Sequence, residues 1–459
     1  MRHTLGVDLE LRAALKTVDA AELGRRVKAA RLAKQLTQAE VAGESVSVAY
    51  VSRIESGLRR PDPELLEAMA SRLGATPEAL VLGITRDEAG ELRLELDYAE
   101  LALATGDGHG ALARSRAVLD TLSAGSEALA PLTRRARYVE AHALETTGAV
   151  ENAILKLESF TATPSNDLPW LRSCIGLCRC YRETGDLARS VATGERALEA
   201  LAASELADST DAIKLNLTLA MAYFEQGDVA YAIRICLRSI DRAEQLRLPQ
   251  ALAAAYWNAS IFQSKSGSLH DAIELARKAL FIFEQGEDAR NLARLRAQLG
   301  VLQLRATPPE ITEAEENLTR AAQEMAWTSA SPTDLARTDL SLARVAYLKG
   351  HLEAALTATT HIADQMNDAA PLLAAEAHAL TGQVQARQGD TVAAAKSYHQ
   401  AVLTLTACGA DRGAAQLWFD LGALLDQVGD TEAARDAYLR AAASTGLTSR
   451  VSASHMADL

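Results

Sequence analysis

The stretch LTQAEVAGESVSVAYVSRIESGLRRP, residues 36–61, carries the signals of two short helices around a tight turn. Thr37 followed by Glu40 fits a capping box, in which two side chains satisfy backbone N–H groups that a helix start leaves unpaired. Ser47 is a candidate cap for the second helix, and Gly57 stands where a helix end favours a left-handed residue. The stretch therefore predicts two capped helices joined by a short turn.

Similar signals continue on both sides of this stretch. Asp19 with Glu22 fits another capping box, and Asp62 and Thr76 each precede a proline at a first helical position. The predicted helices cover about residues 20–34, 38–43, 48–56, 63–73 and 77–82. Apolar residues at helical spacing form the predicted core, namely Leu23, Val27, Leu32, Val41, Val51, Ile54, Leu65, Leu66, Met69 and Leu73.

Positive charge is concentrated in the same segment. The chain has 459 residues and a formal net charge of −13, yet residues 23–60 carry a net charge of +5. An acidic body repels a phosphate backbone, whereas a small basic face can bind one. The distribution favours contact with nucleic acid through this segment.

The segment resembles the Cro/repressor-type, or XRE-type, helix-turn-helix domain. LGRRVKAARLAKQLTQAEVA is similar to the first two helices of that domain, SVAYVSRIESG to its recognition helix, and RRPDPELLEAMASRLG to its fourth helix and the preceding loop. The resemblance implies a buried ion pair between Arg31 and Glu55. It also implies DNA contacts by Gln38, Val48, Ala49, Ser52 and Arg53. The predicted DNA-binding surface further includes Ser47, Arg59 and Arg60.

One departure from that family bears on how DNA is read. The turn AGESVS is one residue shorter than the family's usual spacing, and the side chains of Val48 and Ala49 cannot donate hydrogen bonds. They can pack on thymine methyl groups, which leaves Arg53 as the side chain suited to bidentate reading of guanine. The alternative for Arg53 is a phosphate contact. For Arg59 and Arg60 we expect phosphate contact or plain solvation.

From about residue 91 the sequence repeats itself with a period of roughly 40 residues. Turn glycines mark the period, and a doubled interval after Gly267 predicts a turn without glycine near Thr307. The turn glycines are Gly106, Gly148, Gly185, Gly227, Gly267, Gly350, Gly389 and Gly429. Seven residues before each turn lie the small residues Ala99, Ala141, Cys178, Ala220, Ser260, Gly300, Ala343, Gly382 and Gly422.

Small residues at a fixed phase are needed where paired helices approach closely. Together with WFDLG at residues 418–422, the pattern resembles the tetratricopeptide repeat, although its period exceeds the usual ~34 residues. HEAT-like helical pairs, which have longer periods, rank second. We therefore predict an all-α fold in which about nine helical pairs stack behind the N-terminal domain and leave a concave groove.

Counting back from each turn places mainly basic and aromatic side chains in this groove. Such a groove favours an extended peptide with acidic groups or a free carboxylate, because Arg binds carboxylates and Asn clamps a peptide backbone. The alternative is that many of these residues pair with acids of the adjacent repeat. The predicted ligand-binding residues are Arg135, Tyr138, Arg172, Arg179, Lys214, Met221, Trp257, Asn258, Arg294, Arg337, Arg344 and Tyr347.

Motifs for catalysis, cofactors or metals are missing from the sequence. CIGLCRC offers Cys174, Cys178 and Cys180, but Cys178 occupies the small-residue position and no second ligand pair follows at zinc spacing. There is no HExxH, Walker loop, dinucleotide fingerprint or nucleophile elbow. Neither a bilayer-spanning apolar run nor a signal peptide is evident, so we expect a cytoplasmic protein with reduced thiols, no cofactor and no membrane partner.

The expected organisation is a flexible segment at 1–18, a helix-turn-helix domain at 19–83, a linker at 84–90, a repeat domain at 91–443 and a flexible tail at 444–459. This combination resembles the RRNPP group of peptide-responsive regulators. The resemblance implies a homodimeric transcription regulator that binds double-stranded DNA and a short peptide or other small ligand. The alternative is an adaptor whose repeats dock a partner protein, with the N-terminal domain as a DNA anchor or vestigial. An enzyme ranks third.

Overall fold

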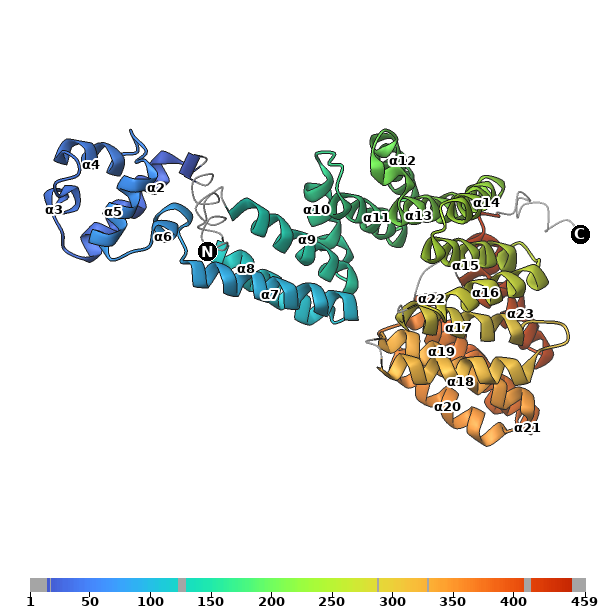
Figure 1. Ribbon diagram of the computed structural model, residues 1–459. Coiled ribbons are helices and arrows are strands. Elements are labelled where there is room, and N and C mark those ends of the chain that lie inside the picture. The colour runs from blue at the N-terminus through green and yellow to red at the C-terminus, as the bar shows by residue number, and fades with distance from the viewer. Residues whose placement is uncertain are drawn as a thin grey trace, which may run out of the picture. The chain divides into compact units, whose positions relative to one another are not determined.

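The computed structural model describes residues 15–16, 18–122, 129–286, 289–327, 330–407 and 414–447. Across these ranges the chain forms helices and turns without a strand, so the predicted all-α fold is confirmed (Figure 1). The chain divides into two compact units, Met1–Asp228 and Val229–Leu459, which we call the first and second units. None of the helices in the described ranges has the length and apolar character needed to cross a bilayer.

The five predicted N-terminal helices are present, and we call this domain the head. Side chains of Asp19, Thr37, Ser47, Asp62 and Thr76 accept hydrogen bonds from backbone N–H groups in the first turns of these helices. The capping box of the second helix is also present. The helices are α2 (Ala20–Ala33), α3 (Gln38–Ala42), α4 (Val48–Glu55), α5 (Pro63–Leu73) and α6 (Pro77–Leu82).

Two details of α2 differ from the prediction. Glu22 does not complete a capping box with Asp19, because its carboxylate pairs with Arg26 one turn further along the helix. Leu32, expected in the core, is 56% exposed. It follows Val27 by five residues, and at 3.6 residues per turn this rotates it by about 140° from the buried face.

The remaining predicted core residues of the head are buried around Leu66 and Met69 of α5. Gly24 of α2 lies directly against the backbone of α4. A Cβ atom at this glycine would lie 2.3 Å from the carbonyl oxygen of Ile54. Helices α2 and α4 therefore touch backbone to backbone, which sets the distance of α4 from the rest of the head.

The connection after the head is shorter than expected. Helix α7 (Arg86–Thr105) begins inside the predicted linker at 84–90, because Thr85 and Glu88 form a capping box at its start. Leu82 and Ile84 pack against the buried cluster around Leu96 of α7. Residues 1–14 and 448–459, which hold most of the predicted flexible segments, lie outside the described residues.

Behind the head, the described chain contains eighteen successive helices, α7 to α24, the number that nine predicted pairs require; α13 ends the first unit and α14 begins the second. The first unit continues with α8 (Gly108–Leu122), α9 (Ala130–Thr146), α10 (Val150–Thr161), α11 (Leu168–Glu183), α12 (Leu187–Leu201) and α13 (Thr210–Gln226). The second unit contains α14 (Val229–Gln245), α15 (Pro249–Lys265), α16 (Leu269–Phe283), α17 (Ala289–Leu304), α18 (Ile311–Trp327), α19 (Pro332–Lys349), α20 (Leu352–Met366), α21 (Pro371–Gln388), α22 (Thr391–Ala407), α23 (Ala415–Gln427) and α24 (Thr431–Ser444).

All eight predicted turn glycines have a positive φ, between 78° and 99°. Residues with a side chain avoid this left-handed region, which explains why glycine marks the period. The predicted turn without glycine lies between α17 and α18, around Thr307. The turns that carry the period are therefore where the sequence placed them.

The small residues seven positions before each turn are all buried, as their phase predicts. At Gly382 a Cβ atom would lie 2.3 Å from Cε1 of Tyr398 on the partner helix of the pair, and Gly422 meets Tyr438 in the same way. Cys178 fills an equivalent position, where the Ser190 hydroxyl donates a 2.9 Å hydrogen bond to its carbonyl oxygen. At these positions, close contact within a helical pair is thus built on small residues.

Candidate nucleic-acid interface and repeat-surface pocket

The end of α4 is fixed by a buried ion pair. Arg31 of α2 donates two hydrogen bonds to the Glu55 carboxylate, at 2.6 Å from Nε and 3.0 Å from Nη2. The two side chains are 11% and 4% exposed. Burial acts to raise the pKa of Glu55, but hydrogen bonds from Arg31 and Gln38 and the charge of Arg31 hold this pKa below its ordinary value. The ion pair between Arg31 and Glu55 expected from the resemblance is present.

Gln38 belongs to the same network. Its side-chain amide donates a 2.9 Å hydrogen bond to Glu55, so α2, α3 and α4 converge on one carboxylate. The carbonyl oxygen of this amide makes no hydrogen bond within the described part of the chain. Gln38 therefore links the start of α3 to the end of α4 through Glu55.

The first turns of α4 present a continuous exposed face. Val48 is 46% exposed, and Ala49, Ser52 and Arg53 are also exposed. The Ser47 hydroxyl accepts a hydrogen bond from the Tyr50 backbone N–H. Its own proton can still be donated to an acceptor. This face combines small, apolar and hydroxyl groups with one guanidinium.

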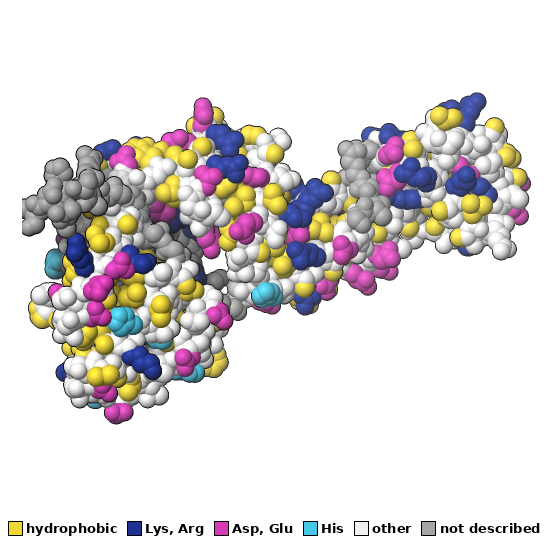
Figure 2. Space-filling model, turned by 180° about the vertical axis from the view of Figure 1, so that it is seen from behind, with side chains coloured by type: hydrophobic (Ala, Val, Ile, Leu, Met, Phe, Trp, Pro, Cys, Tyr) yellow, Lys and Arg dark blue, Asp and Glu magenta, His cyan; other side chains and the backbone are white. Residues whose placement is uncertain are grey.

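Two further arginines extend the exposed basic surface beyond α4. Arg59 lies over the ring of Tyr50, with 4.9 Å between its guanidinium carbon and the ring centroid. Arg60 donates a 2.8 Å hydrogen bond to the carbonyl oxygen of Lys16. Several Lys and Arg side chains appear on the face of the head seen at the right of Figure 2. The positions of Arg59 and Arg60 suit contact with an extended anion better than reading of one base.

Arg72 of α5, a residue that our sequence analysis missed, holds the turn between α3 and α4. Its guanidinium donates hydrogen bonds of 2.9 and 3.0 Å to the carbonyl oxygens of Val41 and Ala42, and one of 2.8 Å to the Ser45 hydroxyl. Gly43 has a φ of 53°, and a Cβ atom there would lie 2.6 Å from the guanidinium carbon. The short turn is thus closed by a side chain from outside it, which local sequence signals do not reveal.

Four of the arginines predicted to bind a ligand pair with acids of a neighbouring repeat. The guanidinium of Arg135 faces Asp97 and Glu100, and that of Arg179 faces Glu145. In the same way, Arg172 pairs with Asp211 and Arg294 pairs with Asp334. These contacts join successive repeats, and they occupy charge that a ligand would otherwise use.

The other predicted ligand-binding residues differ in how accessible they are. Met221 is buried, so it offers little surface. Trp257 donates a hydrogen bond to Gln298, and the Asn258 amide donates one of 2.9 Å to the Ala254 carbonyl oxygen within its own helix.

Three of the exposed basic residues differ from the four paired arginines. Lys214, Arg337 and Arg344 make no ion pair within the described residues. The ring of Tyr347 lies under the guanidinium of Arg387, 5.1 Å from its centroid. Among the predicted bases, these three therefore carry charge that no acid of the described residues pairs with.

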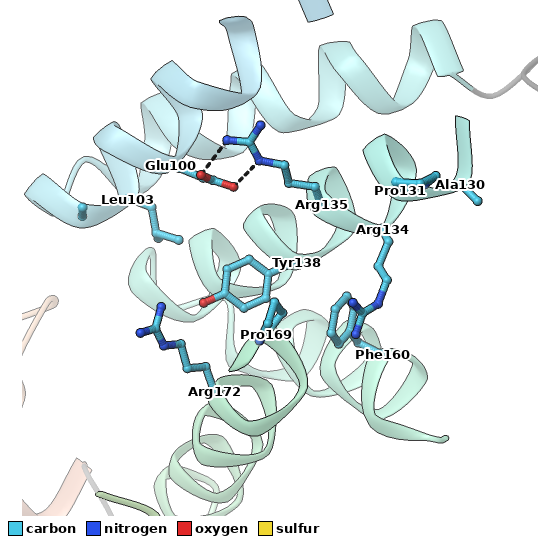
Figure 3. Close-up of a pocket in the computed structure, with 11 residues that line it drawn as sticks. Glu100, Leu103, Ala130, Pro131, Arg134, Arg135, Tyr138, Phe160, Pro169 and Arg172 are labelled. Carbon is cyan, nitrogen blue, oxygen red and sulfur yellow. Dashed lines mark hydrogen bonds and ion pairs between the residues drawn. The ribbon is translucent and has the colours of Figure 1, made fainter. Parts of the chain in front are cut away.

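A pocket of about 890 Å³ lies in the first unit, between α7, α9, α10 and α11. Three of the predicted ligand-binding residues, Arg135, Tyr138 and Arg172, line it. Figure 3 shows the Tyr138 ring among the lining side chains, with its hydroxyl directed towards Arg172. Burial raises the pKa of Tyr138. The pocket also contains residues that the groove positions missed, namely Glu100, Leu103, Ala104, Ala130, Pro131, Arg134, Phe160 and Pro169.

A known domain family matches the head. The helix-turn-helix domain covers residues 22–82, which include all of α3, α4, α5 and α6. Comparison with curated proteins finds no matching sequence.

Solved structures match the chain over a greater length. A Rap protein complexed with Competence and Sporulation Factor matches with a TM-score of 0.54 at 13% identity, covering 78% of this chain and 98% of that one. The apo form of RapI matches with a TM-score of 0.51 at 12% identity, covering 77% and 97%. PlcR from Bacillus thuringiensis, in complex with the peptide PapR7 and DNA, matches with a TM-score of 0.38 at 18% identity, covering 61% and 99%. The chain thus joins an N-terminal helix-turn-helix domain to a helical repeat array with the fold of the Rap proteins.

Proposed function

We propose that this protein is a sequence-specific DNA-binding transcription regulator, and that its repeat domain binds a short peptide or another small ligand. The observation that carries the proposal is the exposed face of α4, from Ser47 to Arg53, held at its far end by the buried pair of Arg31 and Glu55. A rigidly anchored helix with an exposed N-terminal face suits insertion into the major groove.

The groups on this face suit both base reading and phosphate contact. Val48 and Ala49 offer apolar contacts to thymine methyl groups, and Arg53 can donate two parallel hydrogen bonds to guanine. Arg59 and Arg60 add sequence-independent attraction to phosphates. The net charge of +5 over residues 23–60 supports this assignment within an acidic chain.

The proposal of a small ligand rests on the repeat array. The Rap protein of similar fold was solved with Competence and Sporulation Factor bound, so an array of this kind can hold a ligand. In the present chain the pocket between α7 and α11 offers about 890 Å³, within the usual range of small-molecule sites. The pocket includes residues of α7, the helix that directly follows the head.

We also propose that the protein acts as a homodimer. A single head offers a small footprint, and tight specific binding by helix-turn-helix proteins usually joins two half-sites about one helical turn apart. A second copy would supply the second head.

Selection from a random duplex DNA library with the full-length protein tests the DNA-binding role. We expect an enriched motif of two related half-sites, and we expect Arg53→Ala to weaken its binding. Arg435→Ala, which removes an exposed arginine of α24 far along the chain, is the matched control and should bind like the parent. If no motif is enriched, the head is not a sequence-specific reader and the adaptor role becomes the better assignment.

A further inference from the structure

We infer that the pocket between α7, α9, α10 and α11 accepts an aromatic group that carries at most one negative charge. The inference rests on the proposed ligand-binding role of the repeat domain, and it names the chemistry of that ligand. It narrows the extended peptide with acidic groups or a free carboxylate that the sequence favoured.

Two aromatic side chains, Tyr138 and Phe160, line the pocket. The ring centroids of Tyr138 and Phe160 lie 6.0 Å apart at an interplanar angle of 54°, and Tyr138 also contacts the ring of His142, with 4.6 Å between centroids. Tyr138 and Phe160 are both only partly buried, so part of each ring remains exposed. Phe, Trp and Tyr make up only 4% of the chain, which makes two such rings in one cavity a local concentration. A further ring can stack offset or edge-to-face against this pair.

Apolar side chains complete the pocket around the rings. Leu103 and Ala104 come from α7, Pro131 from α9 and Pro169 from α11. None of these four side chains carries a hydrogen-bonding group. A ligand is therefore held in the middle of the pocket by shape and apolar contact, and any polar end must lie at the edge.

Charge at the edge of the pocket is already balanced. Arg134 pairs with Asp167 at 2.8 Å, and its guanidinium also lies over the Phe160 ring, 5.0 Å from the centroid. Arg135 is held by Glu100 at 2.7 Å and by Asp97 at 2.6 Å.

Arg172 completes this set through its pairing with Asp211 at 3.2 Å. Each arginine that lines the pocket thus faces at least one carboxylate, so its charge is already partly neutralised before a ligand with several negative charges arrives. A single carboxylate can still share the longer pair of Arg172 and Asp211, next to the Tyr138 hydroxyl.

The test is a calorimetric titration of the full-length protein without DNA, using four separate probes. Indole, indole-3-acetate and N-acetyl-tryptophan amide carry an aromatic ring and at most one charge, whereas citrate is an aliphatic trianion. We expect the three aromatic probes to bind saturably and citrate to show no saturable binding. Preference for indole-3-acetate over N-acetyl-tryptophan amide would identify a free aromatic acid as the ligand type, and the reverse preference a peptide side chain.

Phe160→Leu keeps an apolar side chain but removes the ring. It should weaken the affinity for the aromatic probes by about tenfold, which is the effect expected when one aromatic contact is lost. Tyr98→Ala is the matched control, because Tyr98 is an exposed ring of the same unit that also lies under an arginine, Arg114, at 5.4 Å. This variant should bind like the parent.

Saturable citrate binding that exceeds binding of the aromatic probes would overturn the inference, and so would an unchanged affinity in Phe160→Leu. Because no DNA is present in the titration, its result is independent of whether the head reads a sequence. Failure of the DNA selection would remove the regulator assignment, whereas failure here would remove only the assigned ligand chemistry.

Discussion

Glu55 closes α4 and accepts hydrogen bonds from both α2 and α3, through Arg31 and Gln38. Removing its carboxylate leaves the Arg31 guanidinium buried without its partner. We expect Glu55→Ala to destabilise the head by ~3 to 5 kcal/mol. Hydrogen exchange of head amides in the full chain measures this loss. Glu44→Ala, which removes an exposed acid of the same domain, should leave the exchange rates unchanged, and equal protection in both variants would contradict the prediction.

Arg53 and Arg59 should differ in what they contribute to DNA binding. If Arg53 reads guanine, Arg53→Ala will relax preference at one base pair by ~1 to 3 kcal/mol. Arg59→Ala should instead weaken binding to all DNA sequences by a similar factor and reduce the salt dependence of the binding affinity. Binding measured over a set of single-base operator variants at two salt concentrations separates the two. An unchanged base preference in Arg53→Ala would make Arg53 a phosphate contact.

Glu145 connects α9 to α11 and should give the first unit an acid-sensitive point. Burial acts to raise the pKa of Glu145, but Arg179 and His142 lower it to about 2. Because the folded-state pKa lies below the ordinary value of 4.5, this stabilisation is fully present above about pH 4.5. It is lost as the pH falls from there towards 2. Unfolding of Glu145→Gln, followed over the same range, should depend less on pH than unfolding of the parent.

At the scale of elements, the turn between α3 and α4 depends on Arg72, which lies about 30 residues further along the chain. Arg72→Ala frees the carbonyl oxygens of Val41 and Ala42 and the Ser45 hydroxyl, so the turn that leads into the N-terminal end of α4 loses its side-chain support. We expect weaker operator binding and reduced base preference, with the helical content of the head retained. Circular dichroism together with the operator variants tests this. If base preference in Arg72→Ala matched that of the parent, the turn would be held by its own backbone.

Helix pairs in the second unit depend on glycine at the closest contact. Gly382→Ala places a Cβ atom 2.3 Å from the Tyr398 ring, which should destabilise the unit by ~1 to 3 kcal/mol through overpacking. Gly90 of α7 is a helical glycine with no atom near its missing Cβ. Gly90→Ala is therefore the control, and it should stabilise its helix by ~0.5 to 1 kcal/mol. Denaturant unfolding of both variants measures the difference, and a loss in both would argue against close contact as the cause.

Elements with local signals were predictable, whereas contacts between distant elements were not. Caps such as Thr37 and Ser47 and the turn glycines fix helix ends through neighbouring backbone, so the sequence alone located them. Arg72 acts on a turn far from it in sequence, and Phe160 enters the pocket from the second helix of its pair, outside the groove positions. The pairing of groove arginines with acids was one of two interpretations that composition left open, because the sequence does not give the distance between facing side chains.

For the whole molecule, the proposed function requires that ligand and DNA affect each other. If the two sites are linked, a ligand that changes operator affinity by some factor must have its own affinity changed by the same factor. Phe160→Leu should reduce the effect of an aromatic ligand on operator binding while operator affinity without ligand stays unchanged. Operator titrations with and without the tightest aromatic probe measure this. An effect of equal size in Phe160→Leu and the parent would place the effector elsewhere.

The buried cysteines allow the two units to be followed separately in time. Cys174, Cys178 and Cys180 lie inside the first unit and Cys236 inside the second, and burial raises the pKa of each thiol to about 12. Because the four thiols are buried and their thiolate forms are scarce at neutral pH, an alkylating reagent reacts with them only when the surrounding helices open. In a background where Cys408 is replaced by Ser, alkylation of the first three reports opening of one unit, and alkylation of Cys236 reports opening of the other. Each unit of the protein thus contains buried thiols whose rate of alkylation measures how often that unit opens.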